Sequence, residues 1–248
     1  MRSPYGLGVV ECCGGCARAG ERAFCNLPPD ALRALDALKF TTLYPKGALL
    51  FVEGQPSRGV YVLCAGRVKL SATSRDARVI ITRIVERGEI LGLCASLSAE
   101  AHEVTAETLE PCQINFIRGE EFLRFLSEHG EAALRVARQL GRDYGAALEQ
   151  VRMLGLSHSA ASKFARFLLE AGSRAPTGFA NGDGATTHAA SDRLKLTLTH
   201  EEIGQHIGAS RETVTRLFSE YKSERLIEVR GTTLLLNNRP ALRAMAGY

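Results

Sequence analysis

The stretch LTHEEIGQHIGASRETVTRLFSEYKSERLIEVRGTTLLL, residues 198–236, decides the fold of the C-terminal part of the chain. Thr199 followed three residues later by Glu202 is the pattern of a capping box, in which each side chain bonds to the backbone of the other residue. It predicts a first helix over residues 201–207. A Gly-Ala turn follows, and Ser210 is a good N-cap residue for a second helix. The two helices are therefore expected to be joined by a tight turn.

The second helix has an apolar face and a polar face. Its apolar side chains recur at spacings of three and four, which buries one side of a helix: Val214, Leu217, Phe218 and Tyr221. The cap and the polar side chains that could reach DNA are Ser210, Arg211, Glu212, Thr215 and Arg216. Two apolar runs, residues 226–229 and 232–236, predict a two-stranded wing. A surface helix with solvated charges would explain neither the cap nor the wing, so we predict a winged helix-turn-helix that reads double-stranded DNA.

The placement of charge favours a polyanionic partner. The whole chain has a formal net charge of +4, which by itself says little. Residues 193–248, however, hold nine Lys and Arg against six Glu. An arginine can bond both O6 and N7 of a guanine, and a glutamate can accept from the amine of a cytosine. Arg211, Arg216 and Glu212 are therefore the expected base-reading side chains.

Upstream, residues 43–116 read as short apolar runs interrupted by glycine. Val68, Leu70 and Ala72 alternate with polar neighbours, which is the period of a half-buried strand. Many short strands at near-regular spacing favour a closed β-roll or jelly roll. The chain is therefore expected to be an α+β protein. Its 248 residues suit two domains, and 45% hydrophobic with 23% charged residues is typical of a water-soluble globular protein.

Between the β-rich region and the C-terminal helices the apolar period becomes helical. One stripe has alternating spacings of four and three: Ala133, Ala137, Leu140, Tyr144, Ala147, Val151 and Leu154. Charged residues flank the stripe, which favours a two-stranded contact with a second copy of the chain. A helix packed on its own domain is the alternative and explains the stripe nearly as well. The expected dimer interface is Ala137, Leu140, Tyr144, Ala147, Val151 and Leu154.

These patterns divide the chain into four parts. They are a cysteine-rich segment over residues 1–26, a sensor domain over 27–130, a dimerisation helix over 131–156 and a DNA-binding domain over 157–248. Within the last part, a helix is predicted at about residues 160–170. The Gly-, Ala-, Thr- and Ser-rich residues 171–192 predict a flexible surface loop.

Four of the seven cysteines lie in ECCGGCARAGERAFC, residues 11–25. The N-terminus lacks the apolar region of a secretory signal, and no apolar run reaches the roughly 18 residues of a membrane span. A cytoplasmic protein without a membrane partner is therefore expected, and clustered thiols in a reducing compartment more often bind metal or do redox chemistry than form disulfides. Cys64 and Cys94 lie in apolar runs and are expected to be buried packing residues. No arrangement of catalytic residues stands out, so no enzyme activity is expected.

The stretch GQHIGASRETVTRLFSEYKSERLI, the glycine-punctuated roll and the heptad helix together resemble the CRP/FNR superfamily of bacterial transcription regulators. The resemblance runs from about residue 27 to the end. SRETVTR is most similar to the cyclic-AMP receptor branch, in which the residues corresponding to Arg211, Glu212 and Arg216 read the half-site; the FNR branch typically has an apolar residue in place of Arg211 and Ser in place of Thr215. The resemblance implies a homodimer on a palindrome with TGTGA-like half-sites, or TTGAT-like as second choice, and RNA polymerase as a partner.

The resemblance also bears on what the roll senses. Members that bind a cyclic nucleotide hold its phosphate with an Arg-Ser or Arg-Thr pair, whereas this chain has His102 and Glu103 near that place. A carboxylate there would repel a phosphate, so no cyclic nucleotide is expected. FNR-type members instead carry N-terminal cysteines and one cysteine of the roll, which together ligate a [4Fe-4S] cluster. Such clusters need four ligands, usually thiolates.

By this resemblance the expected cluster ligands are Cys13, Cys16, Cys25 and Cys112, with Cys12 as a substitute for Cys13. Eight residues separate Cys16 from Cys25, where the best-known FNR pattern has five. The expected function is regulation by oxygen or redox state, with nitric oxide as a further candidate, because cluster loss would weaken dimerisation and operator binding. The alternatives are zinc or thiol oxidation, a small-molecule ligand in the roll, and an iron-sulfur redox protein that binds no operator.

Overall fold

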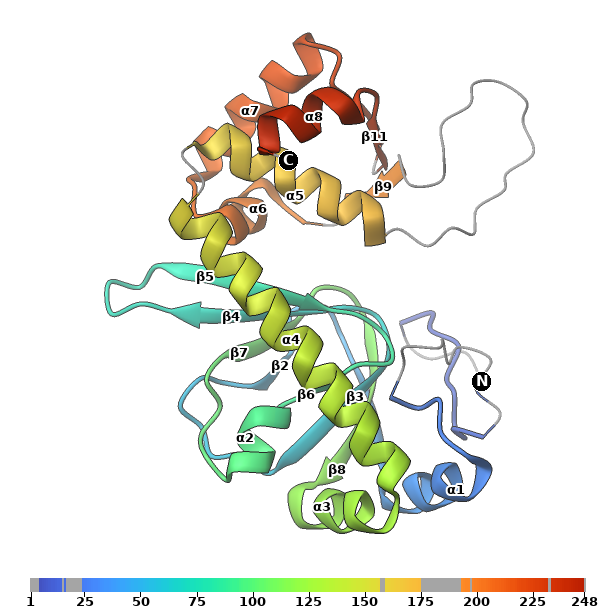
Figure 1. Ribbon diagram of the computed structural model, residues 1–248. Helices are drawn as coiled ribbons and strands as arrows, with labels where there is room; N and C mark the ends of the chain where they lie inside the picture. The colour runs from blue at the N-terminus through green and yellow to red at the C-terminus, as the bar shows by residue number, and fades with distance from the viewer. Residues whose placement is uncertain are drawn as a thin grey trace, which may run out of the picture. The chain divides into compact units, whose positions relative to one another are not determined.

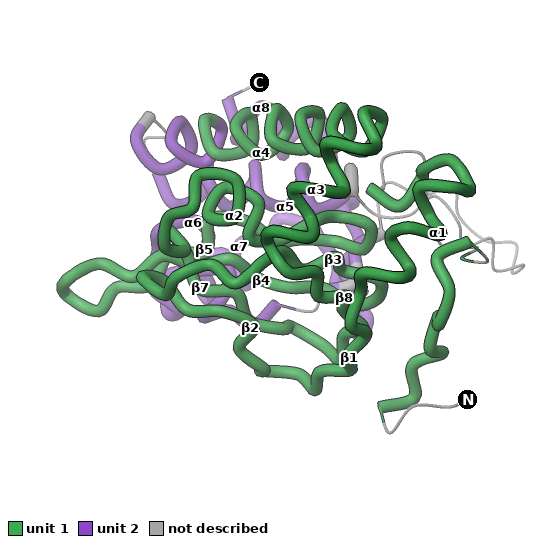
Figure 2. The backbone as a smooth tube through the Cα atoms, turned by 90° about the horizontal axis from the view of Figure 1, so that it is seen from below, with its two compact units in different colours: residues 1–148 green, residues 149–248 purple. Residues whose placement is uncertain are grey.

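The computed structural model describes residues 5–14, 16, 24–156, 159–174, 193–196, 198–231 and 233–247. The chain forms two compact units, Met1–Leu148 and Glu149–Tyr248 (Figure 2). The first therefore contains the N-terminal segment, the roll and most of the long helix. Of the loop predicted over residues 171–192, residues 175–192 lie outside the described part.

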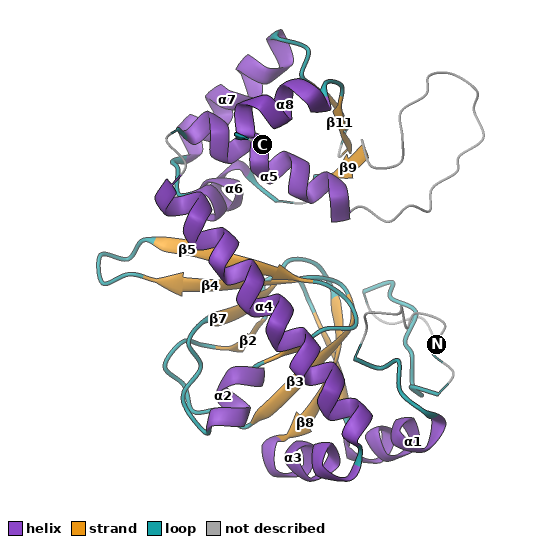
Figure 3. Ribbon diagram, viewed as in Figure 1, coloured by secondary structure: helices purple, strands orange, loops and turns teal. Residues whose placement is uncertain are grey.

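The first unit is built on two four-stranded antiparallel sheets, with strand orders β1-β8-β3-β6 and β2-β7-β4-β5 (Figure 3). The strands are β1 (Phe40–Tyr44), β2 (Leu49–Phe51), β3 (Gly59–Ala65), β4 (Val68–Thr73), β5 (Val79–Val85), β6 (Ile90–Leu91), β7 (Thr105–Thr108) and β8 (Cys112–Arg118). The α+β fold with a β-roll, predicted from the alternating runs, is confirmed.

Four helices accompany the roll: α1 (Pro29–Leu38), α2 (Leu93–Ser98), α3 (Gly119–Glu128) and α4 (Gly130–Leu156) (Figure 1). Two apolar cores result, one on each face of the β1-β8-β3-β6 sheet. The roll core consists of Phe51, Leu63, Val68, Val85, Leu91, Ala106, Cys112 and Ile114. The helix-side core consists of Cys13, Phe24, Leu27, Ala31, Leu35, Val60, Val62, Ile90, Leu93, Ile117, Phe122, Phe125, Ala132 and Val136. The N-terminal segment, α1, α3 and the start of α4 therefore share one core.

Polar bonds fix α4 to the roll. The buried amide of Gln139 accepts from the N–H of Ile90 at 3.0 Å and donates to its carbonyl at 2.7 Å. One helical turn further on, Asp143 forms an ion pair with Arg83 of β5, which also contacts Glu89 at 3.4 Å. Because a buried amide costs free energy when it is left unpaired, these bonds select one face of α4 for packing. The opposite face is left toward solvent.

The second unit contains α5 (Ala160–Arg174), β9 (Arg193–Lys195), α6 (His200–Ile207), α7 (Arg211–Ser223), β10 (Ile227–Arg230), β11 (Thr233–Leu236) and α8 (Arg239–Ala246). Its sheet has the order β10-β11-β9, so the wing has a third strand that the sequence did not predict. The predicted winged helix-turn-helix is confirmed, and α6 lies within one residue of the expected range 201–207. Helix α5 begins where predicted and ends four residues later, at Arg174. Across the residues that the structure describes, no helix is both long and apolar enough to span a membrane.

Candidate DNA-reading helix and cysteine site

The turn between α6 and α7 is built by local backbone chemistry. Thr199 and Glu202 form both bonds of the predicted capping box at the start of α6. Gly208 ends α6 with φ at 68°, a left-handed conformation that favours glycine. A Cβ on Gly204 would lie 2.6 Å from the carbonyl oxygen of Ala209, so this close approach of α6 and the turn also requires glycine. These residues set the angle at which α7 leaves the turn.

Helix α7 begins at its predicted cap, where Ser210 accepts from the N–H of Thr213. Its buried face is the predicted one: Val214, Leu217, Phe218 and Tyr221. These side chains pack on α5, where Phe164 contacts the rings of both Phe218 and Tyr221. The predicted DNA-contacting residues lie together on the exposed side of the helix or at its cap: Ser210, Arg211, Glu212, Thr215 and Arg216.

The exposed side of α7 is already organised by hydrogen bonds. Arg216 pairs with Glu220, one turn along the helix, at 2.5 Å. Backbone N–H bonding at the helix start, helped by Ser210, lowers the pKa of Glu212 and keeps it a carboxylate. An ionised Glu212 can only accept hydrogen bonds, which suits a cytosine amine. The surface thus offers two guanidinium groups and one acceptor.

His200, the first residue of α6, also belongs to this surface. Its ring stacks on Phe218 with centroids 4.5 Å apart, and its Nδ1 lies 2.9 Å from the hydroxyl of Thr215, which also donates to the carbonyl of Arg211. Burial, with the nearby charge of Arg211, lowers the pKa of His200. The Thr215 hydroxyl is therefore held by protein groups and links α6 to α7. The position of His200 directly after the capping residue Thr199 does not indicate that it bonds Thr215.

The predicted seam on α4 lies partly in solvent. Ala137 and Ala147 are exposed, and Tyr144 and Val151 are 68% and 67% exposed. Leu140 packs at the edge of the helix-side core and Leu154 is half-buried. Two further apolar residues that the predicted seam left out, Leu134 and Leu148, are 49% and 40% exposed. The solvent-facing apolar stripe therefore includes four of the six predicted residues and is shifted slightly around the helix.

The N-terminal cysteines are anchored to the end of α1 by Asp36. Its carboxylate accepts from the N–H of Cys13 at 3.0 and 3.1 Å and from the thiol of Cys12 at 3.0 Å. Lys39 bonds the same carboxylate at 2.5 Å and lies 3.4 Å from the sulfur of Cys13. Although its partial burial opposes this, hydrogen bonding by Lys39 and Cys12 holds the pKa of Asp36 well below its usual range.

Three of the predicted ligands lie in this segment. The thiols of Cys13 and Cys25 are in hydrogen-bond contact, and this contact, burial and Asp36 together raise the pKa of Cys13. The N–H of Cys16 donates to the carbonyl of Cys13 at 3.2 Å, so the C-x2-C pair forms a turn. Cys12 is exposed, and it bonds Asp36 instead of another thiol. Of the two, Cys13 is therefore the one directed at Cys25.

Cys112, the predicted fourth ligand, is not brought to these cysteines. It is 0% exposed in the roll core, and its thiol donates to the carbonyls of Glu110 and Arg67 at 3.1 and 3.4 Å. Burial raises its pKa to about 11. A Cβ on Gly66 would lie only 2.4 Å from its sulfur, so Cys112 fills the space under that turn.

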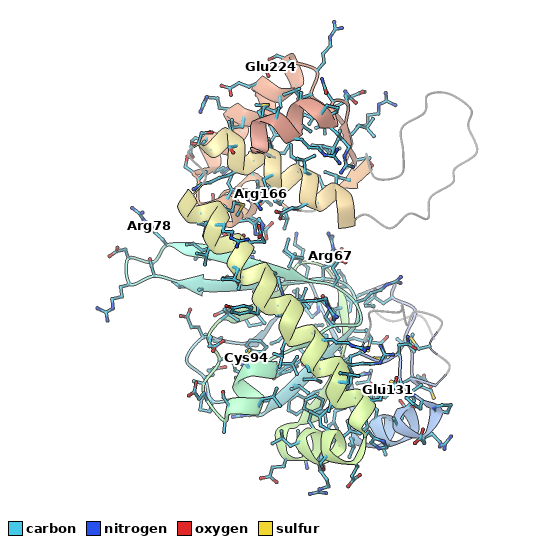
Figure 4. The ribbon with its side chains drawn as sticks, in the orientation of Figure 1. Arg67, Arg78, Cys94, Glu131, Arg166 and Glu224 are labelled. Carbon is cyan, nitrogen blue, oxygen red and sulfur yellow. The ribbon has the colours of Figure 1, made fainter. Side chains whose placement is uncertain are left out.

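The two other cysteines of the roll also differ from expectation. Cys94, predicted to be buried, is exposed on α2 (Figure 4), because its residue falls on the solvent side of a short helix. Cys64, also predicted to be a packing residue, is only half-buried. Among the described residues, no three His, Cys, Asp or Glu side chains are arranged as a metal site.

His102, which stands near the place of the phosphate-holding pair of cyclic-nucleotide proteins, belongs to the packing of the roll. His102 is buried and its ring stacks on Phe51 with centroids 3.9 Å apart. The basic side chains along the neighbouring strands are paired with carboxylates: Arg67 with Glu110, Lys69 with Glu107, and Arg83 with Asp143 and Glu89.

A β-roll, a long helix with an exposed apolar stripe and a winged helix-turn-helix define a DNA-binding transcription regulator with a sensor domain. The family described as the cyclic nucleotide-binding domain matches residues 41–129, and the Crp-like helix-turn-helix domain matches residues 162–245. The chain belongs to the CRP/FNR superfamily of transcription regulators.

Several known proteins are similar along most of the chain. The CRP-like cAMP-activated global transcriptional regulator of Mycobacterium tuberculosis is 24% identical over 93% of this chain and 97% of its own. The transcriptional activator protein FnrA of Stutzerimonas stutzeri is 27% identical over 95% and 92%. The solved structure of FixK2 from Bradyrhizobium japonicum, 21% identical, gives a TM-score of 0.70 and covers 84% of this chain and 96% of that one.

Proposed function

We propose that this protein is a cytoplasmic, homodimeric regulator that binds palindromic DNA, engages RNA polymerase and responds to oxygen or redox state through its N-terminal cysteines. Nitric oxide is a second candidate signal. The observation that carries the sensing proposal is the shared core: Cys13 belongs to the same apolar cluster as Ala132 and Val136 of α4. A change in the cysteine segment thus acts on the packing of the helix that carries the dimer stripe.

The DNA-binding part of the proposal rests on α7. Arg211, Glu212 and Arg216 are exposed together, while the opposite side of the helix is buried. TGTGA-like half-sites are our first choice, because the motif SRETVTR resembles that of the cyclic-AMP receptor branch, and TTGAT-like half-sites are the second. Two reading helices engage one palindrome only when they lie about 34 to 36 Å apart, so the state of the dimer stripe controls affinity.

The sensing part rests on the supply of thiols. A [4Fe-4S] cluster, which is the group implied by the FNR-like cysteine pattern, supplies redox chemistry and is usually ligated by four cysteine thiolates. Cys13, Cys16 and Cys25 supply three thiols from one segment, which Asp36 and Lys39 fasten to α1. The predicted fourth ligand, Cys112, does not fit, because its sulfur lies in the roll core.

Regulation by thiol oxidation without a cluster is the second candidate. It is favoured by one observation, the hydrogen-bond contact between Cys13 and Cys25. Two thiols in contact can form a disulfide when an oxidant such as a peroxide accepts their two electrons and two protons. This alternative predicts a protein without iron whose DNA affinity changes reversibly with a dithiol reductant.

The deciding experiment is purification of the full chain without oxygen, followed by assays of iron and sulfide, an absorption spectrum, and gel shifts against TGTGA and TTGAT palindromes. The proposal expects iron and sulfide, a broad visible absorption that bleaches in air, and a parallel loss of operator binding. Iron-free protein that binds the operator equally well with and without air would contradict the sensing proposal. Absence of operator binding under every condition would contradict the regulatory proposal itself.

A further inference from the structure

Two polar side chains of β8 show which face of its sheet the N-terminal segment covers. Gln113 donates to the carbonyl of Val10 at 2.6 Å and accepts from its N–H at 2.9 Å, and Asn115 accepts from Thr41 at 2.8 Å. Gln113 and Asn115 are 0% and 3% exposed, and the N-terminal segment bonds Gln113 directly. Side chains alternate along a strand, so Cys112 lies on the opposite face. The sheet itself separates its sulfur from the N-terminal thiols.

Cys64 lies on the neighbouring strand β3 at an irregular position. Leu63 is paired with Ile114 and Ala65 with Gln113, so Cys64 is the extra residue of a β-bulge. A bulge redirects a side chain without displacing the core residues that flank it. Here Leu63 remains in the roll core and Ala65 remains buried, while Cys64 is only half-buried.

The surroundings of Cys64 are those of the N-terminal site. Val62, two residues before Cys64 on β3, packs in the same core as Cys13. Burial together with the nearby Cys13 and Cys16 raises the pKa of the Cys64 thiol to about 12, although Lys39 opposes them. By contrast, the groups that act most on the pKa of Cys112 besides burial are Arg67 and Glu110, and its sulfur lies in the roll core. Lys39, at the end of α1, lies 3.4 Å from the sulfur of Cys13, where its positive charge favours a group of thiolates.

We propose that Cys64, and not Cys112, joins Cys13, Cys16 and Cys25 as the fourth thiol ligand of the cysteine site. The identity of the bound group as a [4Fe-4S] cluster rests on the proposed function, whereas the choice between the two cysteines rests on the faces of the sheet. Cys112 is a packing residue beneath Gly66. The thiols are gathered on one side of the sheet, and binding draws them around a common centre, since metal binding and the ordering of its ligands are coupled.

The test compares serine variants of the full chain, purified without oxygen and reconstituted with ferrous iron and sulfide. Cys64→Ser is expected to lose iron, sulfide and visible absorption to the level of Cys13→Ser. Cys112→Ser, Cys112→Val and the exposed control Cys94→Ser are expected to keep the wild-type content, with thermal midpoints recorded to confirm folding. Wild-type iron in Cys64→Ser, or iron lost from a folded Cys112→Val, would overturn the assignment.

A second measurement does not depend on the cluster. Iron-free wild-type protein is treated with diamide, which takes up the two hydrogens as a disulfide forms, and the bridged peptides are identified by mass spectrometry. Disulfides between Cys64 and an N-terminal cysteine are expected, with Cys112 recovered as a free thiol after unfolding. If wild-type protein takes up no iron, the cluster is refuted, and this crosslink decides the placement separately. Absence of any Cys64 bridge would then overturn the placement as well.

Discussion

Arg216 extends from α7 with 63% of its side chain exposed, and its guanidinium is paired with Glu220. An exposed ion pair of this kind is worth about 0 to 1 kcal/mol, whereas a bidentate contact to guanine is worth about 1 to 3 kcal/mol of discrimination. If Arg216 reads a guanine, as we propose, the guanine would therefore displace Glu220 from the guanidinium. Glu220 holds the side chain extended along the helix until that happens.

Arg216→Ala is accordingly expected to weaken operator binding by roughly 5- to 150-fold, which corresponds to about 1 to 3 kcal/mol. Gel shifts against the operator and against a palindrome with the contacted guanine replaced would measure this. Glu220→Ala is the matched control, because it removes the competing carboxylate and should leave affinity equal or higher. Equal loss on both DNA sequences, or loss of the dimer in Arg216→Ala, would show that this residue has another role.

His102 makes the stability of the roll depend on pH. Burial lowers its pKa below the ordinary value, so the folded protein holds the ring neutral while the unfolded chain binds a proton near pH 6.5. The unfolded state therefore binds more protons at mildly acidic pH, and stability falls as pH decreases through that value. We expect the urea midpoint to drop between pH 7.5 and pH 5 more in wild type than in His102→Gln. Equal drops in the two proteins would exclude His102 as the cause.

At the level of single residues, spacing along the chain predicted what is locally encoded. The cap at Ser210, the buried face of α7 and the C-x2-C turn all depend on residues within one or two helical turns. Cys64 and His200 depend on tertiary neighbours: a bulge opposite β8 in one case and a ring stack on Phe218 in the other. Sequence periodicity reveals neither arrangement. Cys64 was therefore predicted to be a packing residue of a strand.

Helix α4 is the element that uses both of its faces. One face is fixed to the roll by Gln139 and by Asp143, and the other carries Tyr144, Val151 and their apolar neighbours in solvent. Exposed apolar stripes of this kind on a long helix mark a contact with a partner. Because the fixed face cannot turn away without breaking buried hydrogen bonds, the stripe is held available for a second copy of the chain.

Tyr144→Glu is expected to convert the dimer to a monomer and to lower operator affinity by at least tenfold, because it places like charges face to face at the centre of the stripe. Analytical ultracentrifugation and gel shifts would record the two effects. Arg124→Glu, on an exposed position of α3, is the charge-changing control and should remain dimeric. A dimeric Tyr144→Glu would place the interface elsewhere.

Element prediction succeeded where a period extends over enough residues. The heptad stripe of α4 and the capped helices α6 and α7 were recognised, whereas α1, α3, α8 and the three-residue strand β9 were not. Those short elements are stabilised by packing on cores assembled from distant parts of the chain, such as Leu35 of α1 against the helix-side core. The exact side of α4 that stays exposed was likewise decided by packing on the roll, which displaced Leu140 from the predicted stripe.

For the molecule as a whole, the helix-side core is the physical link between the cysteine segment and the dimer helix in the proposed sensing mechanism. Phe24, close to Cys25, contacts the rings of Phe122 and Phe125 of α3, and the same cluster includes Ala132 of α4. Loosening the cysteine segment removes Cys13 and Phe24 from this cluster. The start of α4 then loses packing partners while its middle remains bound to the roll through Gln139.

Removal of iron by a chelator should therefore speed amide hydrogen exchange in α1, α3 and the first two turns of α4, while the β4–β5 hairpin is unchanged. Hydrogen exchange followed by mass spectrometry, without oxygen, compares the loaded and chelated proteins directly. The β4–β5 peptide is the internal control, because none of its residues belongs to the helix-side core. Identical hydrogen-exchange rates in α4 before and after chelation would contradict the proposed coupling between the cysteine segment and α4.

The bulge makes the identity of residue 64 independent of the pairing between β3 and β8. The residues on either side of it, Leu63 and Ala65, pair with Ile114 and Gln113 of β8, while Cys64 itself has no partner in that register. A single substitution at position 64 can therefore change the ligands of the proposed cysteine site without changing the strand pairing or the DNA-reading helix.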